Sequence, residues 1–122
     1  MRITAQQLSD RYVAVWNEAN TAARRDAIAQ LWLPDGAHYV TTREARGYAA
    51  LEERIIGSYN KNVRDGGYVF RAVKNAQALH GVVTFNWEMI QPATDEVLAV
   101  GLEFLQIDAD GRIISDFQFI VS

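Results

Sequence analysis

The chain has 122 residues, of which 49% are hydrophobic, and carries a formal net charge of −3 at pH 7. This length suits one domain with a single core, and the mildly acidic balance argues against nucleic-acid binding, which normally needs a basic surface. The absence of cysteine excludes disulfides and thiolate chemistry, and the lack of a long apolar run or of a signal peptide at the N-terminus predicts a cytoplasmic protein.

Two amphipathic helices are predicted first. Thr4 suits the N-cap of the first helix, and Gln7 can complete a capping box with it. This helix is expected to end near Asn20, and Thr21 offers the cap of a second helix, which Pro34 ends. The apolar stripes are Leu8, Tyr12, Val15 and Trp16 in the first helix, and Ala27, Ile28, Leu31 and Trp32 in the second.

A short strand and a third helix are expected next. Residues 37–41 read as the strand, and the polar residues 42–46 read as a loop. Gly47 then opens a helix whose buried face carries Leu51, Ile55 and Tyr59 at helical spacing.

The remainder of the chain has the character of strands. Strands are predicted at residues 68–74, 78–90, 97–107 and 112–121, separated by turn-forming residues such as those at 108–111. Helices followed by an antiparallel meander imply an α+β fold with the helices on one face of the sheet.

Both faces of the strand at 97–106 are largely apolar, whereas a sheet with one wet face should alternate apolar with polar residues. The helices can cover only one of these faces. We therefore expect a homodimer through the outer sheet face, the alternative being high strand propensity on an exposed surface.

Four segments of the chain resemble the nuclear transport factor 2-like superfamily, which includes SnoaL-like polyketide cyclases, ketosteroid isomerases and many small bacterial proteins. They are residues 11–17, residues 31–37, the Arg46-Gly47 pair and residues 110–113. The resemblance spans about residues 5 to 120 and implies a single SnoaL-like domain over residues 1–122. It also implies a cystatin-like α+β barrel, in which a cone-shaped, curved antiparallel sheet wraps around three helices and leaves a pocket at its mouth.

Three residues are the candidate catalytic groups. The resemblance implies that Tyr12 donates a hydrogen bond to a substrate oxyanion; the alternative is a core aromatic residue. Glu103 interrupts an apolar strand, and a buried carboxylate is costly unless it is paired or protonated. The resemblance implies that it is a neutral donor beside Tyr12, and the alternative is a glutamate at an edge or in a salt bridge. Asp116 faces the cavity with Gln118 if the family's register holds, and faces solvent otherwise.

A proton-abstracting base is less evident. Many enzymatic members of the superfamily carry an acidic base where this chain has Thr41, and a threonine hydroxyl cannot act as that base near neutral pH. The base would then be Glu103, Asp116 or His80. His80 is a weak candidate, and His38, at the start of a strand, is weaker.

Further side chains are candidates for lining a ligand pocket, although each aromatic residue among them also fits a plain core. These candidates are Trp16, Trp32, Tyr39, Thr41, Tyr59, Phe85, Trp87 and Gln118.

The sequence favours a protein that binds a small apolar organic molecule, with a cofactor-free isomerase or cyclase acting on a carbonyl compound as the enzymatic possibility. No metal site is expected, because the two histidines do not lie at helical spacing. The alternatives are a non-catalytic ligand carrier and a protein-interaction module that uses the sheet face.

Overall fold

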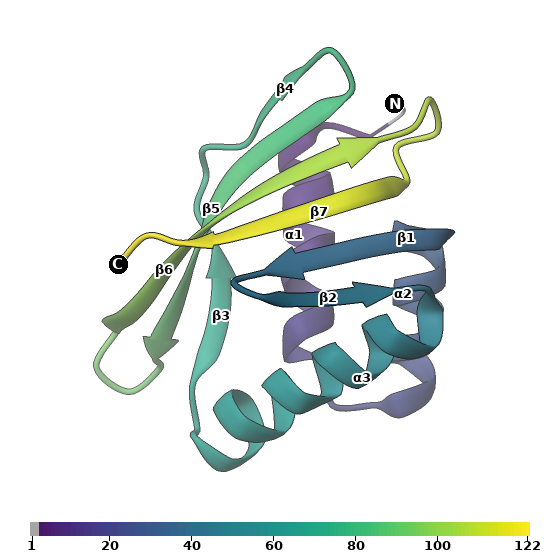
Figure 1. Cartoon of the computed structure of the whole chain (residues 1–122). Coiled ribbons are helices and arrows are strands. Elements are labelled where there is room, and N and C mark those ends of the chain that lie inside the picture. The colour runs from purple at the N-terminus through teal and green to yellow at the C-terminus, as the bar shows by residue number, and fades with distance from the viewer. Residues whose placement is uncertain (1–2) are drawn as a thin grey trace.

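The computed structural model describes residues 3–122, in which three α-helices and a π-helix accompany seven strands (Figure 1). Met1 and Arg2, the first residues of the expected domain, lie outside the described residues. The helices are α1 (Ala5–Asn17), α2 (Thr21–Leu31), α3 (Tyr48–Ser58) and the π-helix η1 (Tyr59–Asp65). The strands are β1 (Trp32–Val40), β2 (Arg43–Arg46), β3 (Val69–Ala72), β4 (Gln77–Leu79), β5 (Val82–Gln91), β6 (Glu96–Ile107) and β7 (Ile113–Ile120).

The strands form one curved sheet in the order β2-β1-β7-β6-β5-β3, and β4 pairs with β5. The α+β class with a curved sheet is confirmed, and the sheet is mixed, because β1 and β7 run parallel while the other pairs are antiparallel. β1 forms a hairpin with β2 on one side, so its other edge is free to receive β7 from the end of the chain. The parallel register places His38 beside Asp116 and Val40 beside Gln118.

Local signals explain where most elements begin. The Thr4 side chain accepts a hydrogen bond from Gln7 N, and Gln7 Oε1 accepts one from Thr4 N, so the capping box of α1 is confirmed. In α2 the N-cap is Asn20 rather than Thr21, since Asn20 Oδ1 accepts a hydrogen bond from Ala23 N at 2.8 Å. Pro34 does not end this helix; it lies inside β1, which begins at Trp32.

The segment expected as a loop at residues 42–46 contains strand β2. Its side chains are mostly exposed, because β2 is the edge strand of the sheet, and this explains why it lacks an apolar pattern. Thr41, with a φ of 51°, makes the tight turn between β1 and β2.

The helices lie on the concave face of the sheet. Figure 1 shows α1 running behind the long strands, with α3 crossing below β2. The core between these layers is built from residues that all three α-helices and strands β5 to β7 contribute. Trp32, at the α2–β1 junction, is fully buried within it. None of the helices within residues 3–122 has the length and apolar character to cross a membrane; a cytoplasmic location stays a prediction.

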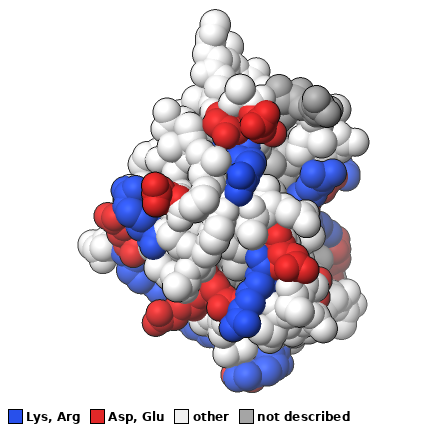
Figure 2. All heavy atoms as spheres, turned by 90° about the vertical axis from the view of Figure 1, so that its right-hand side faces the viewer, with Lys and Arg blue, Asp and Glu red and all other residues white. Residues whose placement is uncertain are grey.

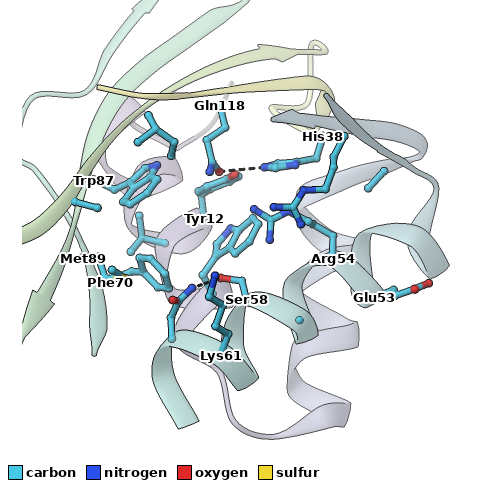
Figure 3. A pocket seen from close by; sticks show the side chains of 18 of the residues that line it. Tyr12, His38, Glu53, Arg54, Ser58, Lys61, Phe70, Trp87, Met89 and Gln118 are labelled. Atoms are coloured by element: carbon cyan, nitrogen blue, oxygen red, sulfur yellow. Dashed lines mark hydrogen bonds between the residues drawn. The ribbon is translucent and has the colours of Figure 1, made fainter. Parts of the chain in front are cut away.

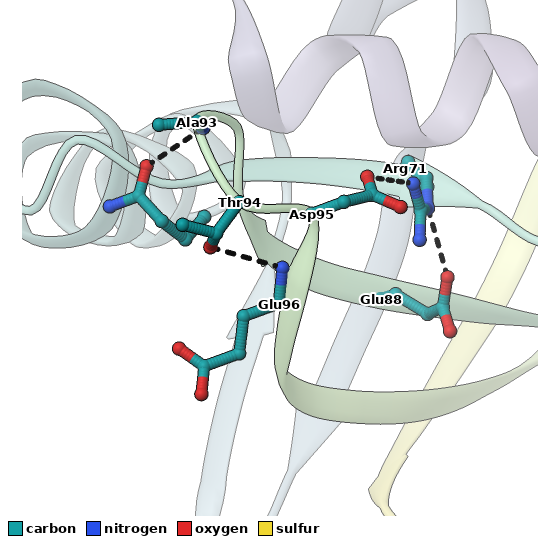
Figure 4. Close-up of polar contacts among 7 residues, drawn as sticks. Arg71, Glu88, Ala93, Thr94, Asp95 and Glu96 are labelled. Atoms are coloured by element: carbon teal, nitrogen blue, oxygen red, sulfur yellow. Dashed lines mark hydrogen bonds and ion pairs between the residues drawn. The ribbon is translucent and has the colours of Figure 1, made fainter.

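Surface charges tie the short strand β3 to its neighbours. Arg71 Nε lies 2.9 Å from Glu88 Oε1 on β5, and its Nη1 lies 2.7 Å from Asp95 Oδ1 in the β5–β6 turn (Figure 4). Such exposed pairs contribute modestly to stability, and the pair with Glu88 joins direct cross-strand partners of β3 and β5. On the face shown in Figure 2, acidic and basic side chains alternate, and neither sign forms an extended patch among the residues drawn there.

The contact between Gly101 and Trp87 shapes the inner face of the sheet. These residues are direct cross-strand partners on β6 and β5. A Cβ atom on residue 101 would lie 2.0 Å from Cε2 of the indole, so only glycine allows Trp87 to lie flat against β6.

We predict that Gly101→Ala lowers the free energy of unfolding by about 1–3 kcal/mol, because the indole must move out of a packed site. Urea denaturation followed by fluorescence measures this change. Gly57→Ala is the matched control: its new Cβ meets nothing within 4 Å on α3, so it should be neutral or stabilise by about 0.5–1 kcal/mol. Equal stability of Gly101→Ala and the wild-type protein would contradict this account of the packing.

Candidate active site

A cavity of about 750 Å³ opens between the helices and the curved sheet. Its volume falls within the usual range for small-molecule sites. Its walls are mainly apolar, and a few polar side chains converge on it (Figure 3). The apolar walls include Val13, Trp16, Phe70, Trp87 and Met89, and the polar groups include Tyr12, His38, Arg54, Ser58 and Gln118.

Behind this cavity, Tyr12 joins two carboxyl groups in the core. Its hydroxyl oxygen lies 2.6 Å from Asp116 Oδ2 and 3.1 Å from Glu103 Oε2. The other oxygen of Glu103, Oε1, accepts a hydrogen bond from Trp87 Nε1 at 2.8 Å. Glu103 and Asp116 are both completely shielded from solvent. The cluster of Tyr12, Glu103 and Asp116, here called the acid cluster, therefore connects α1 to β6 and β7.

Burial raises the pKa of two members of the acid cluster, Glu103 and Tyr12. Loss of solvent, and then the neighbouring Asp116, raise the pKa of Glu103 well above its ordinary value of 4.5. Burial and the two carboxyl groups also raise the pKa of Tyr12. A phenol has one proton, and the shorter contact directs it to Asp116. The protonated Glu103 can then donate its own proton to the Tyr12 oxygen, which satisfies both contacts.

His38 stands beside the acid cluster and borders the cavity. Its Nε2 lies 3.1 Å from Gln118 Oε1 and 3.7 Å from Asp116 Oδ2. Burial lowers the pKa of His38, outweighing the opposing effect of Asp116, so the ring is neutral at pH 7. An amide oxygen only accepts hydrogen bonds, so Nε2 carries the proton. Nδ1 then keeps a free lone pair, and it has no hydrogen-bond partner within the described chain.

The structure brings some of the sequence-predicted residues together. Tyr12, Trp16, Trp87 and Gln118 border the cavity. Glu103 and Asp116 do not border it; they lie behind Tyr12 and contact the cavity residues Tyr12, Trp87 and His38.

The remaining predicted pocket residues lie elsewhere, and the structure corrects their expected position. Trp32 and Phe85 belong to the core, where they pack on the Tyr12 ring with centroid distances of 5.6 and 5.5 Å. Tyr39 lies on the outer sheet face and stacks on Phe117, because alternation along β1 turns His38 inward and its neighbour outward. Thr41 is exposed in the β1–β2 turn, and Tyr59 packs below Arg24.

Two cavity residues carry chemistry that the sequence did not reveal. His38 was ranked below His80, but His80 lies in an exposed turn with a φ of 47°. His38 gains its role because the parallel pairing of β1 with β7 places it beside Asp116. A sequence pattern within β1 does not reveal this pairing. Arg54 lies next to Glu52 and Glu53 in the sequence and so resembles part of a solvated helix face, yet it turns into the cavity.

His38, Glu103 and Asp116 also have the composition of a metal site. Each offers one ligand atom, and the three atoms lie within 4.8 Å of one another. The Tyr12 hydroxyl already forms hydrogen bonds with both carboxyl groups. A divalent cation would have to displace these hydrogen bonds, so the hydrogen-bonded arrangement describes the site better.

Comparisons with known proteins place this fold. No family model and no curated protein matches the chain. A solved structure from Agrobacterium tumefaciens, described as a candidate isomerase of the SnoaL-like family, is similar over 97% of both chains, with a TM-score of 0.85 and 20% identity. A SnoaL-like protein of unknown function from Burkholderia thailandensis is similar over 98% of this chain and 99% of its own, with a TM-score of 0.71 and 17% identity.

A third structure, an NTF2-like protein of unknown function from Exiguobacterium, covers 94% of this chain and 98% of its own, with a TM-score of 0.71 and 16% identity. These likenesses define a class by fold alone: a cone-shaped α+β arrangement of helices and a curved sheet. The chain has the fold of the nuclear transport factor 2-like superfamily in its SnoaL-like form, and the resemblance stated from the sequence is confirmed at the level of fold.

The raised pKa of Glu103 predicts a pH-dependent stability. The folded protein keeps this proton above pH 4.5, where the unfolded chain has released it. The stability that Glu103 contributes is therefore complete below pH 4.5 and is lost as the pH rises toward the folded-state pKa. The Glu103→Gln variant should not show this loss. The free energy of unfolding of the wild-type protein should therefore fall by up to about 1.4 kcal/mol per pH unit relative to that of the variant.

Urea denaturation between pH 5 and pH 9 measures this difference. Glu96→Gln, at an exposed position on the same strand, is the control and should keep the wild-type slope. Parallel pH profiles for wild type and Glu103→Gln would show that Glu103 is ionised in the folded state.

Proposed function

We propose that the protein binds a small organic carbonyl compound in the cavity and catalyses its isomerisation or cyclisation by cofactor-free acid–base chemistry. One observation carries this proposal: a tyrosine that borders a cavity of about 750 Å³ shares its hydroxyl with two fully buried carboxyl groups. Burying two such groups in a core is costly, and apolar residues of similar size would fill the space at lower cost. Strongly perturbed acids beside a cavity are typical of functional sites.

The geometry suggests which residue is the base and which residues donate hydrogen bonds to the ligand. His38 is the base, because it is neutral, it borders the cavity and its Nδ1 has no hydrogen-bond partner among residues 3–122. Nδ1 is buried, so the ligand must displace its neighbours to reach this lone pair. Gln118 uses Oε1 for its contact with His38, which leaves its amide N–H groups for the oxygen of a ligand. Tyr12 is the second donor to that oxygen: when the ligand binds, its one proton turns from Asp116 to the ligand, while the protonated Glu103 still donates to the Tyr12 oxygen.

This assignment differs from a direct proton transfer by Glu103 or Asp116. Both carboxyl groups lie behind the cavity wall, so they act on a ligand through Tyr12 and His38. The proton removed from carbon returns to the same molecule in an isomerisation, so the chemistry needs no redox partner. The Agrobacterium protein described as a candidate isomerase and a Sinorhizobium meliloti structure described as a candidate polyketide cyclase have related folds, which supports this class of reaction.

We expect the protein to accelerate exchange of the protons next to the carbonyl of 2-tetralone in deuterium oxide, followed by proton NMR. Tyr12→Phe and His38→Gln should each slow this exchange by about 10²–10⁴-fold, since they remove a donor and a base. The matched controls are Tyr39→Phe and His80→Gln, which change the same residue types outside the cavity and should leave the rate unchanged.

Two results would contradict the proposal in different ways. If His38→Gln keeps the wild-type rate, the base is another group. If 2-tetralone and related cyclic ketones bind without any exchange, the protein is a ligand carrier rather than an enzyme.

We also propose that two copies of the chain associate through the outer sheet face. This face exposes large apolar side chains on β6 and β7, among them Phe104 and Phe119, with Phe119 54% exposed. Phe117 joins Phe104 and Tyr39 in an aromatic group there, with centroid distances of 6.1 and 5.1 Å. The helices cover the opposite face, so a second copy is the partner that this surface fits best.

Light scattering after size-exclusion chromatography tests the association. The wild-type protein should have twice the mass of the chain, and Phe119→Asp should shift it to the monomer, because a buried unpaired charge disfavours the interface. Leu79→Asp, at an exposed leucine on β4, is the control and should remain dimeric. A monomeric wild-type protein at all concentrations would overturn this arrangement.

A further inference from the structure

The cavity holds positive charge that the acid–base chemistry does not use. Three cationic side chains border it: Arg43 from β2, Arg54 from α3 and Lys61 from η1. Within residues 3–122 none of the three takes part in an ion pair, although other arginines, such as Arg25 and Arg71, do.

Arg54 is the most strongly placed of these groups. Figure 3 shows its side chain reaching from α3 into the cavity. Its guanidinium carbon lies 5.0 Å from the centroid of the Trp16 ring, and its Nε is buried without a hydrogen-bond partner among residues 3–122. Burial and the adjacent Arg43 both lower the pKa of Arg54, so the two guanidinium groups repel each other at the cavity wall.

Arg24 and Arg112 also have a buried Nε without a partner, but the protein itself holds their guanidinium groups through Nη2. Arg24 donates from Nη2 to the carbonyl oxygen of Glu18 at 2.6 Å. Arg112 donates from Nη2 to the carbonyl oxygens of Ala29 and Trp32 and to the Tyr48 hydroxyl. These two arginines hold the fold together. Arg54 makes no such hydrogen bond within the described part of the chain, so its donors are available to a molecule that enters the cavity.

The acidic residues at the cavity do not compensate Arg54. Glu44 borders the cavity, but its nearest cationic partner is Arg46, at 3.4 Å. Glu53 is exposed, and Figure 3 shows its carboxylate directed away from the cavity centre. Glu103 and Asp116 attract Arg54 electrostatically, but neither forms an ion pair with it among the described residues. A half-buried guanidinium without a contacting counter-ion is costly, and a carboxylate that accepts two of its N–H groups offsets this cost.

We propose that the natural ligand is an organic carboxylate whose anionic end binds Arg54, with Arg43 adding charge at the same wall. Its apolar body then packs against Trp16, Phe70 and Trp87, and its reacting end meets His38 and Gln118. This proposal rests on the proposed function in that the cavity is the ligand site, and it replaces the purely apolar ligand expected from the sequence with an amphipathic acid.

The test compares three probes of one shape: 2-naphthoate, the neutral 2-naphthamide, and 2-naphthyl phosphate. Binding to the full chain is measured by calorimetry, and the Arg54 Nε–H signal is followed by NMR. Wild type should bind 2-naphthoate at least about tenfold more tightly than 2-naphthamide, the scale expected of charge-assisted hydrogen bonds. The Arg54 Nε–H signal should move on adding 2-naphthoate.

Arg54→Gln should abolish the preference for 2-naphthoate and leave the binding of 2-naphthamide unchanged. Arg43→Gln should reduce this preference in part, and because Arg43 is exposed the change cannot disturb the core. Arg64→Gln is the control: it removes the same charge from an exposed arginine that pairs with Asp65, and should have no effect.

Three results would overturn the proposal. Equal affinity for 2-naphthoate and 2-naphthamide would show that the cavity does not select a charge, while the proposed function would still stand on exchange of 2-tetralone. Tighter binding of 2-naphthyl phosphate than of 2-naphthoate would assign the site to phosphate esters. Absence of binding by all three probes at millimolar concentration would show that Arg54 captures no anion.

Discussion

The hydrogen bonds of the Tyr12 hydroxyl to Glu103 and Asp116 join the first helix to the two central strands of the sheet. Because all three groups are removed from solvent, these hydrogen bonds are strong, and an unpaired member would be costly. Glu103 also accepts a hydrogen bond from the Trp87 indole, and Asp116 lies 3.7 Å from His38 Nε2, so the same network reaches both cavity residues. A site that depends on a buried network is rigid, and a rigid arrangement of donors is what transition-state stabilisation requires.

Local physical chemistry made much of this fold predictable. The capping box at Thr4 involves residues three positions apart, and the alternation along β5 places Val83, Phe85 and Trp87 on one buried face. Glu103 was recognisable because a charged residue in an apolar strand demands a partner. These signals lie within single elements, where the spacing of side chains determines which of them are buried.

The rest of the site depends on contacts between distant parts of the chain. His38 becomes important only because β1 pairs in parallel with β7, and no pattern within residues 37–41 specifies that pairing. Tyr39 was expected inside because the phase of alternation in a short strand is difficult to assign, and a one-residue change exchanges the two faces. Arg54 was missed because neighbouring acidic residues make its helix face resemble a solvated surface.

The position of β7 in the sheet also has a consequence for how the molecule assembles. This strand is the last element of the chain, yet it lies between β1 and β6 in the middle of the sheet. The sheet therefore cannot close until the final strand inserts between elements that are already made. Contacts of such large sequence separation form slowly, since a long loop must be closed before they are gained. Until β7 has paired with both neighbours, β1 and β6 each keep an unpaired edge, and His38 lacks the strand that places Asp116 and Gln118 beside it. The sheet and the site therefore form in the same step.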